Sequence, residues 1–146
     1  MLNKHGQLFL AVVIFFDTIV ISFSWLAAFY IHFKTSLGPS PRYATPEIEI
    51  YLLALIPVWI VFIFSTRIYG LYKPLRGKPI STELFKIIRV TSFSVIVLAA
   101  LTFFYREESF SRFVAVYFYA IVTTLMFTSH LLVRLMLAKA RALGFN

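Results

Sequence analysis

Four long apolar runs constrain this chain more than any other feature of its sequence. They cover residues 8–31, 50–66, 90–105 and 113–133, and Asp17 is the single acidic residue within them. A helix that spans a bilayer needs about 20 mostly apolar residues, with about 17 to 25 observed. Of the 146 residues 60% are hydrophobic and 14% are charged, which is more apolar surface than a soluble domain of this length can bury.

These runs predict an all-α fold: one integral membrane domain over residues 1–146, with four transmembrane helices in an antiparallel bundle. The predicted spans, extended by their flanking residues, are 8–31, 50–69, 84–105 and 112–137. The first run is too long for the core of a cleavable signal peptide, so we expect it to be retained as a span. Pro57 predicts a kink in the second span.

The distribution of basic residues predicts the orientation. Ten of the 14 lysines and arginines lie in the N-terminal segment, the second connector and the C-terminal segment. By the positive-inside rule these three segments face the cytoplasm. Within the second connector, Ser81 is a predicted N-cap and Glu83 a first-turn acid favoured by the helix dipole, so the third helix should start near Ser81.

The second connector is also a predicted lipid-facing surface, because clustered cations beside a span attract anionic headgroups. Its candidate contact residues are Lys73, Arg76 and Lys78. Two interpretations stay open: general attraction of anionic lipid, or a specific site for a phosphorylated lipid. Because the charge is spread along a membrane face, nucleic acid is not an expected partner.

Asp17 needs a partner, because placing a carboxylate inside a span costs on the order of a few kcal/mol even on translocon-insertion scales. At a rise of about 1.5 Å per residue it lies about 13 Å from the cytoplasmic end of the first span, while His130 and Arg134 lie about 10 and 5 Å from that end of the fourth. We therefore predict that the first span packs against the fourth, with Asp17 bonded to His130 or Arg134. A proton relay is the alternative, with no second acid expected inside the hydrocarbon.

Other polar and aromatic residues are given structural roles. Serines and threonines inside the spans are expected to pack helices together, and no pore is predicted. An interfacial aromatic belt is predicted from Trp25, Phe29, Tyr30, Tyr43 and Tyr51.

Neither catalytic residues nor a bound metal or cofactor are predicted within the chain. The three histidines, His5, His32 and His130, fall on different helices or sides, so they indicate no metal cluster. "RGKPIS" lacks the glycine spacing of a phosphate loop, and no serine lies in a Gly-x-Ser-x-Gly elbow.

Three segments carry a family resemblance: "FFDTIVISFSWLAAFYIHF", "YGLYKPLRGKPISTELFKIIRV" and "SFSRFVAVYFYAIVTTLMFTSHLLVRLMLAKARALGFN". In order and spacing the chain resembles the N-terminal membrane domain of bacterial polyprenyl-phosphate hexose-1-phosphate transferases, which start exopolysaccharide, capsule or O-antigen units. The resemblance implies a location in the bacterial inner membrane and transfer of a sugar phosphate from a UDP-sugar to undecaprenyl phosphate. It also implies a Rossmann-like segment and a Mg²⁺-dependent catalytic domain C-terminal to residue 146, so this chain would be the anchor.

Three other readings remain open. Membrane-bound nucleotide-sugar 4,6-dehydratases carry a similar four-span N-terminus, although "FSR" and "LGFN" favour the transferase. A small transporter and a stand-alone membrane scaffold are the other two. The sugar, and whether copies associate as homo-oligomers, are left undetermined by the residues.

Overall fold

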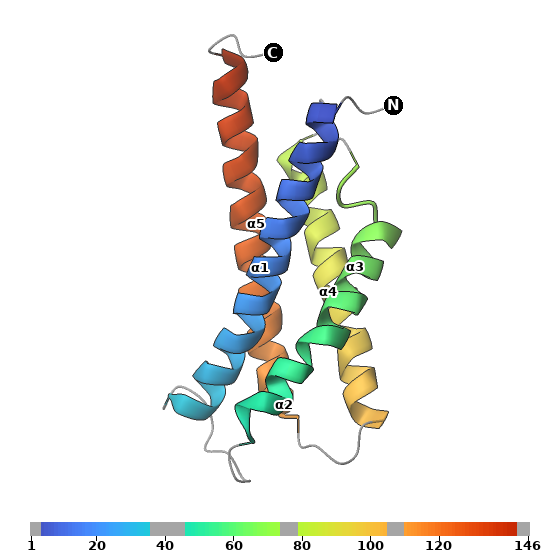
Figure 1. Ribbon diagram of the computed structural model, residues 1–146, viewed down its shortest axis with the longest axis vertical. Helices are drawn as coiled ribbons and strands as arrows, with labels where there is room; N and C mark the ends of the chain where they lie inside the picture. The colour runs from blue at the N-terminus through green and yellow to red at the C-terminus, as the bar shows by residue number, and fades with distance from the viewer. Residues whose placement is uncertain (1–3, 36–45, 74–78, 105–109, 143–146) are drawn as a thin grey trace.

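The computed structural model describes residues 4–35, 46–73, 79–104 and 110–142. Four long apolar helices pack there as an antiparallel bundle, which confirms the predicted all-α fold class (Figure 1). The elements are α1 (Lys4–Lys34), α2 (Ile48–Leu53) with α3 (Leu55–Ile68), α4 (Ile80–Phe104) and α5 (Arg112–Ala142). We call the end at which α1 begins and α5 ends the inner end, after the predicted orientation, and the opposite end the outer end.

Each helix, taking α2 and α3 together, is long and apolar enough to cross a membrane. The candidate spans are Gly6–Lys34, Ile48–Ile68, Ile80–Phe104 and Arg112–Lys139. Large apolar side chains cover the outside of the bundle; Phe15, Phe64 and Phe103 are each more than 60% exposed. Such a surface is favourable only where lipid replaces water.

The second span is broken near Pro57. Proline lacks a backbone N–H and its ring clashes with the carbonyl four residues earlier, here that of Leu53, which is where α2 ends. The helical hydrogen bonds flank the missing one on both sides, from Ala54 N to Ile50 O at 3.0 Å and from Val58 N to Ala54 O at 3.2 Å. The kink predicted at Pro57 is therefore present as the joint between α2 and α3 (Figure 1).

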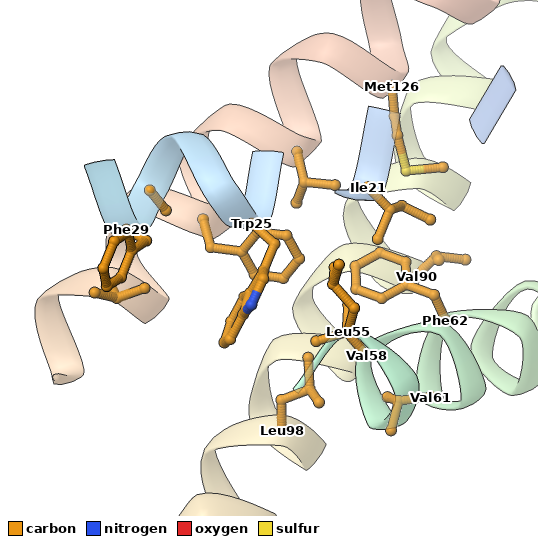
Figure 2. Packing of buried hydrophobic residues seen from close by; sticks show 14 of the residues in the cluster. Ile21, Trp25, Phe29, Leu55, Val58, Val61, Phe62, Val90, Leu98 and Met126 are labelled. Carbon is orange, nitrogen blue, oxygen red and sulfur yellow. The ribbon is translucent and has the colours of Figure 1, made fainter. Parts of the chain in front are cut away.

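An aromatic core fills the outer half of the bundle. Trp25 lies between Phe29 and Ile21 on α1 and faces α3 (Figure 2), and the edge-to-face contact of its ring with Phe118 of α5 has a centroid distance of 5.2 Å. Its indole N–H donates to the backbone carbonyl of Tyr51 at 2.9 Å. Because this N–H is hydrogen-bonded inside the protein, Trp25 does not have to lie at the membrane interface to find an acceptor.

The predicted aromatic belt is consequently wrong for most of its members. Trp25, Phe29 and Tyr51 are buried in the core, and Tyr30 is exposed. Tyr43 lies outside the described residues. The error arose because depth along a span does not reveal which side of the helix faces its neighbours.

Helix pairing follows the prediction, since α1 packs most extensively against α5, and α4 packs against both α3 and α5. Hydroxyl groups join the neighbours: Ser94 donates to Ser65 across α4 and α3 at 2.8 Å. Thr123 of α5 donates to Thr91 of α4 at 3.0 Å. These serines and threonines pack helices together, as expected.

The inner end of α3 lies deeper in the bundle than the inner ends of its neighbours (Figure 1). Ser65, in the last turn of α3, is level with Ser94 through their hydrogen bond. Ser94 lies about four turns into α4, so α3 ends about 15 Å below the start of α4. The connector between α3 and α4 therefore has to cover this distance.

A Schellman motif turns the chain at this point. The N–H of Leu71 bonds the carbonyl of Thr66 at 3.0 Å, and the N–H of Gly70 bonds that of Arg67 at 3.2 Å. The motif requires a left-handed residue after the C-cap, and Gly70 supplies it with a φ of 58°. The turn buries Leu71 and directs Tyr72 toward the interior.

We expect Gly70→Ala to lower the free energy of unfolding by about 1 kcal/mol, because an L-residue is strained at this φ. The added Cβ would also lie 2.9 Å from Lys73 Cδ, so that flexible side chain would have to move. Gly6→Ala, within α1, is the matched control and should be neutral or slightly stabilising. Unfolding of the detergent-solubilised protein measures both, and equal stability of the two variants would contradict a strained turn.

Candidate functional site: a buried acid–histidine cluster

Asp17 lies on the inner half of α1 with its side chain turned into the bundle, where the residue is 2% exposed. Its Oδ2 is 3.1 Å from Nε2 of His130 on α5. The same oxygen accepts a hydrogen bond of 2.8 Å from the hydroxyl of Tyr72 in the connector. The structure thus brings Asp17 together with His130, one of the two partners predicted for it.

His130 links two acids from different helices. Its Nδ1 is 2.9 Å from Oε1 of Glu83 on α4, while Nε2 faces Asp17. A neutral imidazole can donate at one nitrogen only, whereas the imidazolium donates at both. With both carboxylates ionised, this geometry therefore calls for the cationic ring.

Arg134 completes the arrangement from one turn further along α5. Its Nη1 lies 3.4 Å from Oε2 of Glu83. Asp17, Glu83, His130 and Arg134, together with Tyr72, form what we call the acid–histidine cluster. Two carboxylates, an imidazolium and a guanidinium balance in charge, which is the condition for burying them at tolerable cost.

Two members, Glu83 and Tyr72, were missed by the sequence analysis. Glu83 had been assigned to the helix dipole and excluded from the hydrocarbon, but it lies inside the candidate span Ile80–Phe104 and contacts His130. α4 does begin near Ser81, at Ile80, with Glu83 in its first turn as predicted. The rotation of α4 against α5 turns Glu83 toward His130, and that rotation is set by packing. The available signal was that Glu83 directly precedes the predicted third span, which starts at residue 84.

Tyr72 was missed because only the turn at Gly70 aims it inward. Burial raises the pKa of the Tyr72 hydroxyl above its ordinary value, and the adjacent Asp17 carboxylate raises that pKa further. The hydroxyl therefore stays protonated at neutral pH and remains a hydrogen-bond donor to Asp17.

The connector is also fastened to α4. Lys86 Nζ donates to the carbonyl of Gly70 at 2.8 Å, so the turn is held by a charge-assisted bond. Of the predicted lipid-contact residues, Lys73 is exposed at the end of this turn. Arg76 and Lys78 lie outside the described residues.

Along α1 the polar cluster has no continuation toward the outer end. His32, at the outer end of α1, bonds Ser111 at 2.8 Å, and it lies about four turns from Asp17 along the same helix. Between these two levels the buried residues of α1 are Ile21, Ser24, Trp25, Ala28 and Phe29. Since the hydroxyl of Ser24 bonds its own helix, at Val20 O, this layer interrupts a relay along α1 between the two ends.

The fold and cluster define a four-span membrane bundle with an ion-paired interior. Residues 67–146, more than half of the chain, match the model of a family described as a CoA-binding domain, and the chain belongs to this family. Domains of this family are found in the N-terminal region of sugar transferases. Searches of curated proteins and of solved structures found no significant match.

The described residues of the matched segment present no site that fits coenzyme A in the groove beside them. They comprise the end of α3, the turn at Gly70, and helices α4 and α5, without a strand in these ranges. The groove beside them has apolar walls and one arginine. An adenine nucleotide with several phosphates needs converging polar groups that these walls lack.

We expect Asp17→Ala to lower the free energy of unfolding by about 3 kcal/mol, because it leaves His130 and Glu83 without the balancing charge in a buried network. Thr18→Ala is the control, since the Thr18 hydroxyl bonds only its own helix at Ile14 O. Thermal unfolding in detergent compares the two variants.

A double-mutant cycle with His130→Ala then measures the coupling between the two side chains. The loss in the double variant should be well below the sum of the single losses. Additive losses, or an Asp17→Ala variant as stable as Thr18→Ala, would show that Asp17 is not held by this cluster.

Proposed function

We propose that this chain is the membrane-anchoring domain of an initiating sugar-1-phosphate transferase of the bacterial inner membrane, acting in exopolysaccharide, capsule or O-antigen synthesis. The reaction would move a sugar phosphate from a UDP-sugar to undecaprenyl phosphate. The observation that carries the proposal is the family match over residues 67–146, since this family occurs in the N-terminal region of sugar transferases.

The arrangement of the helices supports an anchoring role. α1 begins and α5 ends at the same end of the bundle (Figure 1), which is also the end that the basic residues assign to the cytoplasm. A catalytic domain attached after α5 would therefore meet a UDP-sugar on the side where nucleotide sugars are made. We assign catalysis to that attached domain and no catalytic residue to this chain.

In this proposal the acid–histidine cluster is a structural clamp. Asp17, Glu83 and His130 come from α1, α4 and α5, and Tyr72 comes from the connector. Their contacts join three helices and hold the basic connector against the bundle. The polar residues of α1 do not continue from Asp17 to His32, so this helix gives the transporter alternative little support.

The test is an assay of the full-length gene product in membrane vesicles, with a radiolabelled UDP-sugar and undecaprenyl phosphate. We expect label in the organic phase and release of UMP. A heat-inactivated sample and one without undecaprenyl phosphate are the controls.

Other outcomes would overturn the proposal. A 4-keto-6-deoxy nucleotide sugar formed without any lipid product would identify the dehydratase alternative. Absence of turnover with every UDP-sugar, in a protein that partners with separate polysaccharide enzymes, would favour the scaffold.

The proposal includes attraction of anionic lipid, or of undecaprenyl phosphate, to the connector. Replacing Lys73, Arg76 and Lys78 together by glutamine should weaken association with anionic vesicles by about 3 kcal/mol, at about 1 kcal/mol for each cation. A triple variant at Lys34, Arg42 and Arg112, in the other connectors, is the control of equal charge. Unchanged vesicle association in the first variant would remove the lipid-contact role.

A further inference from the structure

A groove on the lipid-facing surface lies between α3 and α4. It has a volume of about 410 Å³, within the range of about 300–1,000 Å³ typical of ligand sites. The residues that line it are Ile60, Val61, Ile63, Phe64, Arg67, Phe93 and Val97. All but Arg67 are apolar, so the groove suits a hydrocarbon chain.

Arg67 is the one cation among the residues that line this groove. It lies in the last turn of α3, at the inner end of the candidate span Ile48–Ile68 and about 15 Å from the level at which α4 begins. Its side chain is exposed, and within the described ranges it forms no ion pair. An exposed arginine at the inner end of a span lies where anionic headgroups gather.

A second cation lies on the same side of α4. Arg89 precedes the groove residue Phe93 by one turn and is exposed, so it stands on the same helix face nearer the inner end. Within the part of the chain that the structure describes, Arg89 also lacks an acidic partner. The two arginines and the apolar walls match a phosphate head followed by one acyl chain.

We propose that this groove binds one anionic phospholipid of the inner leaflet. The acyl chain lies between α3 and α4, and the phosphate is held by Arg67, with Arg89 on the inner side of it. The site differs from the connector cations, and it does not depend on the transferase function.

Native mass spectrometry of the purified full-length protein tests the site, with phosphatidylglycerol and phosphatidylcholine offered in equal amounts. We expect one retained phosphatidylglycerol, with affinity lowered about five-fold by Arg67→Gln, as for the loss of one cation near a headgroup. Arg112→Gln, at the outer end of α5, removes the same charge elsewhere and should have no effect.

A second pair of variants tests the groove itself. Val97→Trp fills it and should abolish retention, whereas Ile96→Trp adds the same ring on the neighbouring exposed position, where Ile96 is 67% exposed, and should bind normally. Equal retention of the two lipids, or equal affinities of Arg67→Gln and Arg112→Gln, would overturn the proposal. The arginine comparison decides the matter even where Val97→Trp does not fold.

Discussion

The hydrogen-bonded ion pair between Asp17 and His130 is the interaction on which the inner half of this bundle depends. Hydrocarbon offers no partner to a carboxylate, so Asp17 is tolerable only where the protein supplies both a positive charge and donors. His130 and Tyr72 do so, at 3.1 and 2.8 Å. Because these partners lie on α5 and on the connector, satisfying one acid also sets the rotation of α1, its pairing with α5 and the path of the chain after α3.

The early end of α3 has a second set of consequences. The Schellman turn at Gly70 directs Tyr72 to Asp17, and Lys86 holds the turn against α4. The same early end places Arg67 beside an apolar groove, at the inner end of the second span. One structural feature thus stabilises the interior of the bundle and creates a charged recess on its lipid-facing surface.

Sequence reasoning succeeded where the answer depended on distance along a helix. Four spans, the joint at Pro57 and the pairing of the first span with the fourth follow from length, proline chemistry and a fixed rise per residue. It failed where the answer depended on the side of a helix or the conformation of a connector. Trp25 was assigned to the interface although it is buried, and Glu83 was assigned to the surface although it contacts His130.

The sequence by itself determined that this is a four-span membrane chain, and it predicted the orientation of the spans. Both follow from the hydrophobicity and the charge of residues that are neighbours along the chain. Its family membership also follows from sequence. The tertiary structure alone decided which groups complete the cluster and how deep α3 ends. Both depend on helix rotation and relative offset, which are set when distant segments pack, because each buried polar group must find a partner on another element.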